Sequence, residues 1–260
     1  MNNTFILLIG IFITLFATLI GSCLVFFIKK ELSPKATDII NGASAGIMIS
    51  ATIFGLILPS FSLSSNLKEF YFLPAIVGIV IGSFFLLLTD AILLLITKNK
   101  QSNPTLNSKK ATHLWLAFSL HNIPEGLAIG FAFGNAINAG TSAAYLSALS
   151  LSIAIAIQNI PEGLVVALPI FSQTKSKSKS FLFSILCGII EPIFAIAGIF
   201  VATKIQFLMP WLLCFAAGTI IFVTIDDILP ESKHSPDSHI GAYSFIFGFL
   251  LMMSLNILLG

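Results

Sequence analysis

The sequence predicts an all-α membrane protein with eight transmembrane helices, organised as a single domain over residues 1–260. Its composition, the placement of its lysines and a duplicated motif all favour this fold class. Hydrophobic residues make up 57% of the chain and charged residues 9%, whereas a soluble domain has about 25% charged residues. A spanning helix needs about 20 apolar residues, so 260 residues provide for eight spans and for no separate soluble domain.

Short polar connections separate eight apolar segments, and we expect each segment to form one helix. The first segment could be read as a signal peptide, but residues 1–4 carry no Lys or Arg. Its apolar run is also longer than the ~7–15 residues of a signal sequence, so we interpret it as the first transmembrane helix. The segments lie at residues 4–28, 38–60, 71–97, 112–135, 142–171, 181–203, 208–230 and 240–259.

The lysines predict the orientation, because the cytoplasmic loops of membrane proteins are enriched in Lys and Arg. All 13 basic residues are Lys. If the N-terminus lies outside, all of them except Lys68 and Lys204 fall in or beside the inner loops. With eight helices, both termini are then extracytoplasmic, and the fourth and fifth helices run in opposite directions. The inner loops are residues 29–37, 98–111, 172–180 and 231–239.

A six-residue motif occurs twice, each time inside a long apolar run. Residues 121–126 read His-Asn-Ile-Pro-Glu-Gly and residues 158–163 read Gln-Asn-Ile-Pro-Glu-Gly. A carboxylate at membrane depth costs at least ~2.5–3.5 kcal/mol to insert, so Glu125 and Glu162 each need a partner or a function. Because their helices are antiparallel, a pseudo-twofold axis in the membrane plane relates the two copies. Repeated, proline-broken helices that meet at the midplane are typical of a transporter binding site.

The residue types of this motif suit a bound metal cation. His121 and Glu125 are one helical turn apart on one face, and each proline leaves a backbone carbonyl free to bind a cation. A third acid, Glu191, is also followed by proline, in the middle of the sixth segment. Imidazole, carboxylate and amide oxygen together suit Zn²⁺, Fe²⁺, Mn²⁺ or Cd²⁺ rather than Na⁺. In the alternative interpretation proline and glycine only kink and pack these helices, which two opposed copies and a third buried acid disfavour.

Several further acids lie at or near the predicted inner helix ends. Asp38, at the start of the second segment, is expected to be a helix N-cap. Two interpretations are open for Asp90, Asp226, Asp227 and Glu231. They are either solvated helix termini or the lining of an exit path, since an acidic funnel attracts a departing divalent cation.

The paired motifs on consecutive helices resemble those of the ZIP (Zrt-, Irt-like) divalent metal transporters, in particular the GufA-like branch. The resemblance covers the whole chain, with eight helices and both termini outside. It implies a binuclear metal site between helices 2, 4, 5 and 6, with the glutamates as bridges, at the centre of the transport path. Residues 45–48, Ala-Gly-Ile-Met, match the family's helix 2 pattern. The implied metal ligands are Met48, His121, Asn122, Glu125, Gln158, Asn159, Glu162 and Glu191.

The resemblance also implies the function, which is uptake of divalent transition metals, zinc and related ions, by alternating access. Other members often carry His where Gln158 stands and Asp where Asn159 stands, so neutral ligands should loosen this site. No cofactor is implied. The expected partners are the transported metal ions and the lipid bilayer, with no nucleic acid, and a homodimer stays open. The expected location is the cell membrane, which the chain crosses several times.

An intramembrane metalloenzyme that uses a metal-bound water is the alternative from another functional class. The sequence lacks His-Glu-x-x-His, so a zincin site is not expected, and neither is a serine hydrolase site. It also lacks the phosphate loop Gly-x-x-x-x-Gly-Lys-Ser/Thr, so we expect no ATP hydrolysis by that route. We therefore predict a transporter rather than an enzyme.

Overall fold

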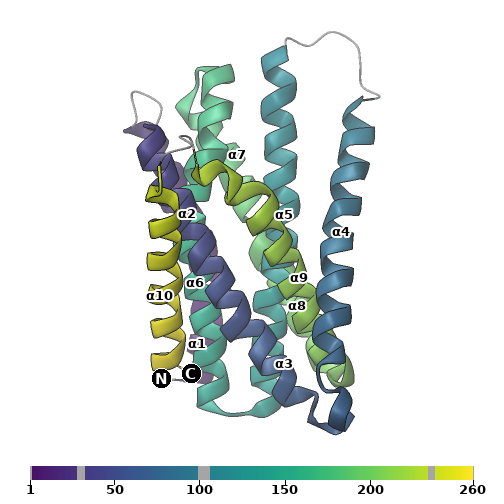
Figure 1. Ribbon diagram of the computed structural model, residues 1–260. Helices are drawn as coiled ribbons and strands as arrows, with labels where there is room; N and C mark the ends of the chain where they lie inside the picture. Colours follow the sequence, from purple (N-terminus) through teal and green to yellow (C-terminus); the bar gives the residue numbers. More distant parts are fainter. Residues whose placement is uncertain (1, 28–32, 99–105, 234–237, 260) are drawn as a thin grey trace.

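A computed structural model describes residues 2–27, 33–98, 106–233 and 238–259. Within these ranges the secondary structure is helical, without a β-strand. Figure 1 shows the long helices running along a common direction, with both ends of the chain at the same end of the bundle. The helices are α1 Asn3–Cys23, α2 Pro34–Thr52, α3 Leu58–Leu63, α4 Leu73–Lys98, α5 Leu106–Ala139, α6 Ser142–Thr174, α7 Lys177–Gly188, α8 Ile190–Lys204, α9 Met209–Val223 and α10 Ile240–Leu259.

Each predicted apolar segment contains a helix, and two segments are built from two helices each. α2 continues into α3 through a π-helical turn, η2 (Ile53–Ile57), and α7 is separated from α8 at Ile189. Six helical stretches among the described residues are long and apolar enough to cross a membrane, and α4 adds the shorter apolar helix Leu73–Thr89. The chain thus has the helices of a multi-span membrane protein, while the number of eight spans stays a prediction.

The helices pack mainly as four pairs. The most extensive contacts join α1 to α6, α5 to α8, α2 to α10 and α4 to α9. α5 and α6 also contact each other, and α7 packs against α6 and α1. Buried apolar side chains such as Phe133 of α5, Leu151 of α6 and Leu213 of α9 form one core between the pairs. Asn122, Glu125, Gln158 and Asn159 of the repeated motifs are buried as well, so these polar side chains lie inside the protein.

The glycine of each motif marks a close approach of two helix backbones. A Cβ atom at Gly126 would overlap the Glu191 carbonyl of α8, and one at Gly163 would lie 2.5 Å from the Thr18 carbonyl of α1. Small residues at helix crossings allow such contacts in membrane proteins. These two glycines therefore fix how closely α8 and α1 approach the motif helices.

The start of α2 differs from the prediction for Asp38. The N-cap of α2 is Ser33, whose side chain accepts a hydrogen bond from the Ala36 N–H, and Pro34 is the first helical residue. Proline suits this position because its fixed φ is helical and its missing N–H would have no partner there. Asp38 lies within the helix and is 2% exposed, so its N-cap interpretation is wrong.

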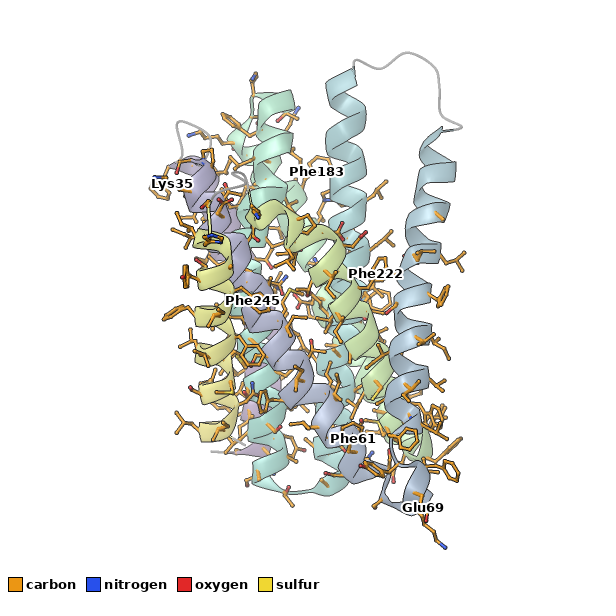
Figure 2. The ribbon with its side chains drawn as sticks, viewed as in Figure 1. Lys35, Phe61, Glu69, Phe183, Phe222 and Phe245 are labelled. Carbon is orange, nitrogen blue, oxygen red and sulfur yellow. The ribbon has the colours of Figure 1, made fainter. Side chains whose placement is uncertain are left out.

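The charged residues at the bundle ends agree in part with the predicted orientation. Figure 2 shows Lys35 and Glu69 at opposite ends of the molecule, as expected if one is inside and the other outside. Both chain ends lie at the end that carries Glu69. Which end faces the cytoplasm rests on the lysine distribution and stays a prediction.

Candidate metal site

Gln158 lies between the two motif glutamates. Its Nε2 atom donates to Glu162 Oε2 at 2.9 Å, one turn along α6, and to Glu125 Oε1 on α5 at 3.3 Å. Glu125 and Gln158 are buried, and Glu162 is half-buried. The two copies of the motif therefore meet, as their antiparallel arrangement predicts, and a neutral amide holds the carboxylates together.

Glu191 joins the same region through Asn159. Asn159 Nδ2 donates to Glu191 Oε2 at 2.7 Å and approaches the Thr14 carbonyl of α1 at 3.5 Å. Glu191 is fully buried and lies in the first turn of α8, directly after the break at Ile189. The N-terminal end of a helix carries a partial positive charge, so the break places this carboxylate where the backbone stabilises it.

Asn122 links α5 to the end of α7. Its Nδ2 atom donates to the Cys187 carbonyl at 3.0 Å and lies 3.4 Å from the Cys187 sulfur. The last carbonyls of a helix lack intrahelical partners, so this amide helps to satisfy the C-terminal end of α7. The side-chain nitrogens of Asn122, Gln158 and Asn159 thus all donate to protein acceptors.

The oxygens of these same side chains have no partner. A buried polar atom without a hydrogen bond costs about 1–3 kcal/mol, so such atoms are rare in folded proteins. Here they gather on residues that the hydrogen bonds already join. Bound cations would supply the missing partners. The unpartnered buried oxygens of the motif residues and Glu191 are Asn122 Oδ1, Glu125 Oε2, Gln158 Oε1, Asn159 Oδ1 and Glu191 Oε1.

Amides separate the three carboxylates. Among the described residues, no three His, Cys, Asp or Glu side chains come close enough to hold a metal by themselves. Gln158 stands between Glu125 and Glu162, and Asn159 contacts Glu191. A cation held here would therefore need amide oxygens beside the carboxylates, which is an oxygen-rich environment for a divalent ion.

The other predicted ligands have different outcomes. Met48 is buried in α2, and its sulfur accepts a hydrogen bond from Thr224 Oγ1 at 3.5 Å. Its place among the metal ligands stays a prediction. The backbone of His121 belongs to α5, but its side chain lies outside the part of the structure that is described.

The predicted exit-path acids are described only in part. Asp226 and Asp227 are exposed in the π-helical turn η5 (Thr224–Ile228), which follows α9. The side chains of Asp90 and Glu231 lie outside the described residues. Both interpretations of these acids, as solvated helix termini or as the lining of an exit path, therefore stay predictions.

The motifs do not point to two further features of the sequence. Residues 42–46 read Gly-Ala-Ser-Ala-Gly, which matches the serine hydrolase pattern by letter. They lie inside α2, with Gly42 and Gly46 against the α10 backbone, whereas a nucleophile elbow is a strand-to-helix turn. Thr14 of α1 lies beside Asn159 and Glu191, but a single threonine in an apolar run gives no signal of function.

Comparison with known proteins identifies the family of this chain. A family profile described as "ZIP Zinc transporter" matches residues 111–256, which include both motifs and Glu191. The chain is 31% identical to zinc transporter ZIP11 of Xenopus tropicalis, over 97% of each chain. It is 31% identical to zinc transporter ZupT of Chlorobaculum parvum, over 94% of this chain and 93% of the relative. It is 30% identical to zinc transporter GufA of Myxococcus xanthus, over 90% and 91%. The chain belongs to the ZIP family of zinc transporters.

Proposed function

We propose that this protein takes up divalent transition metals across the membrane, with zinc among its substrates. The observation that carries the proposal is the group of buried side-chain oxygens without partners on the motif residues. Family membership supports the reaction, because the relatives are named zinc transporters. The same relatives give no support to the alternative of an intramembrane metalloenzyme.

The proposed site holds two metal ions that share the carboxylates of Glu125 and Glu162. The contact of Gln158 with both glutamates supports a shared position. The contact of Asn159 with Glu191 supports a second position next to it. The first ion would bind His121, Glu125, Gln158 and Glu162, with Met48 nearby, and the second would bind Asn122, Glu125, Asn159, Glu162 and Glu191.

The amides explain how such a site can release its ion. Without a cation, Gln158 Nε2 holds both glutamates by hydrogen bonds, so the carboxylates keep a partner. When a cation enters, it takes these carboxylate oxygens and the Gln158 oxygen in place of the Nε2 contacts. A transport site must bind its ion weakly enough to let it leave. An amide that replaces the cation lowers the cost of the empty site and so favours release.

Alternating access is the proposed mode of transport. Within a helix pair, glycines allow the two backbones to approach closely, as Gly126 of α5 does against α8. Contacts between pairs, such as Leu151 of α6 against Gly55 in η2, are made by side chains. Closely packed pairs that contact one another through side chains can move as units around a central site. In this mode Asp226 and Asp227 would attract the ion on its way out.

The proposal includes eight spans with both termini outside and a place in the cell membrane.

The test of metal transport is uptake of radioactive zinc, manganese, iron and cadmium by proteoliposomes that contain the purified protein, with competing cations and a varied pH gradient. We expect saturable, protein-dependent zinc uptake. Liposomes that contain folded protein but take up no divalent metal under any of these conditions would refute the proposal.

A further inference from the structure

Thr14 of α1 and Ser50 of α2 are exceptions among the buried hydroxyls of the described helices, because neither hydroxyl has a hydrogen-bond partner. Thr14 lies next to Asn159 of the second motif. Hydroxyl groups inside apolar helices usually donate to the carbonyl one turn earlier. Thr18, Thr52 and Thr224 all do so, with distances of 3.1, 2.7 and 2.7 Å. Thr14 is 0% exposed, yet its hydroxyl has no hydrogen-bond partner. This side chain therefore gives up the local bond that its neighbour Thr18 makes.

The surroundings of Thr14 suggest a reason for its unused hydroxyl. Its backbone carbonyl lies 3.5 Å from Asn159 Nδ2, and the same nitrogen donates to Glu191 at 2.7 Å. The Thr14 hydroxyl lies close enough to the Glu191 carboxylate to interact with it, although the two form no well-aligned hydrogen bond. Thr14 Oγ1, Asn159 Oδ1 and Glu191 Oε1 are all buried and unpartnered. Three contacting residues, from α1, α6 and α8, thus each carry a buried oxygen without a hydrogen-bond partner.

We propose that Thr14 is a further ligand of the transported cation, at the position that Asn159 and Glu191 share. The inference rests on the proposed metal transport. It gives α1 a direct part in binding, although neither the motifs nor Glu191 lie on that helix. A hydroxyl is a neutral oxygen ligand, which suits hard ions such as Mn²⁺ better than soft ions such as Cd²⁺. Thr14 therefore helps to set the range of ions that the site accepts.

A purely structural role of Thr14 would give a different pattern of metal affinities in its variants. A hydroxyl with only a structural role would donate to the carbonyl one turn earlier, as Thr18 does, or would only hold the Glu191 carboxylate. Replacing such a hydroxyl by a methyl group of the same shape would then change stability without changing ion preference. Metal affinity and its dependence on the type of metal distinguish the two roles, because packing does not discriminate Mn²⁺ from Cd²⁺.

The test compares Thr14→Val with Thr14→Ser in the purified full-length protein. Equilibrium binding and proteoliposome uptake are measured for Mn²⁺, Zn²⁺ and Cd²⁺. We expect Thr14→Val to weaken Mn²⁺ binding by ~10-fold or more, the usual effect of losing a partner at a metal site, and to affect Cd²⁺ less. Thr14→Ser keeps the hydroxyl and should bind like the wild type. The matched control is Thr18→Val, the same substitution one turn away, which should leave all three affinities unchanged.

Thr14→Cys gives a second test that does not depend on the valine variant folding well. A thiol at this position should raise the ratio of Cd²⁺ to Mn²⁺ affinity by ~10-fold or more, because thiolate prefers soft ions. Wild-type ratios in both Thr14→Val and Thr14→Cys, beside a wild-type protein that binds and carries metal, would overturn this inference alone. A wild-type protein that neither binds nor carries metal would overturn the proposed transport as well.

Discussion

Replacing Gln158 by His makes the two motifs identical in their first residue and tests the role of this amide. In the structure Gln158 Nε2 donates to both Glu125 and Glu162, while Oε1 is buried without a partner. A neutral imidazole has only one N–H. The variant can therefore keep one of the two hydrogen bonds in the metal-free protein and offers a nitrogen ligand to the metal.

The expected change in metal affinity follows from these two hydrogen bonds. A hydrogen bond to a charged group contributes about 1.5–3 kcal/mol, so losing one destabilises the metal-free site by that amount. Every divalent ion should then bind up to ~10–150-fold more tightly, since each 1.4 kcal/mol is about a factor of ten. The nitrogen ligand adds a gain that is larger for Zn²⁺ than for Mn²⁺. We expect the ratio of Zn²⁺ to Mn²⁺ affinity to rise by ~10-fold or more.

The assay is uptake of Zn²⁺ and Mn²⁺ against concentration for the wild type and Gln158→His. Tighter binding slows release, so maximal uptake should fall while affinity rises. Gln206→His is the matched control, because Gln206 is exposed in the turn between α8 and α9 and contacts Asn138 rather than the site. An unchanged ratio of Zn²⁺ to Mn²⁺ affinity in Gln158→His would show that Gln158 does not bind the metal.

Three further predictions concern orientation, the bridging acids and the Asn122 contact. In a variant without native cysteines, a Cys in the 98–111 loop should resist impermeant maleimide in intact cells and one near Asn66 should react, because the lysine excess places that loop inside. Glu125→Ala and Glu162→Ala should each nearly abolish radiometal uptake by folded protein, since losing a shared carboxylate leaves cations unbalanced at low dielectric. Asn122→Leu should lower both uptake and the free energy of unfolding, the latter by about 0.5–1.5 kcal/mol, as measured by denaturant titration in detergent.

Each of these predictions has a control and an opposing outcome. Labelling of the 98–111 site from outside would reverse the orientation. Lys68→Ala, at an exposed site, should transport normally, and wild-type uptake by a folded Glu162→Ala protein would count against shared carboxylates. Asn138→Leu also removes an amide that donates to a helix-end carbonyl, at 3.2 Å from Ala202. It should lower stability without lowering uptake, and the same pattern in Asn122→Leu would limit Asn122 to a structural part.

Much of the fold and the core of the site could be predicted because both depend on strong chemical contrasts. Apolar runs with lysines between them predict where the helices lie. A carboxylate in such a run needs a partner, so Glu125 and Glu162 could be placed together from their spacing and opposed helix directions. The same reasoning predicts that Glu191 belongs to this site, and in the structure it accepts a hydrogen bond from Asn159 of the second motif.

Other features depend on atomic contacts that no local pattern encodes. Hydropathy marks only the apolar part of a helix, so it predicts a start at Asp38 for the helix that begins at Pro34, with Ser33 as its cap. The contact of Asn122 with the Cys187 carbonyl arises only when α5 and α7 pack together. Thr14 became noticeable only because its hydroxyl lacks the bond that neighbouring threonines make.

A structure of the protein crystallised with zinc, with the metal located by anomalous scattering, tests the central claim most directly. The claim is that the carboxylates and amides around Glu125, Glu162 and Glu191 bind the transported ion. We predict a zinc peak within ~2.0–2.2 Å of oxygens of Glu125 and Glu162, the usual zinc–carboxylate distance. Zinc that binds elsewhere in a protein still competent for transport, with the Gln158 hydrogen bonds to both glutamates unchanged, would contradict the account.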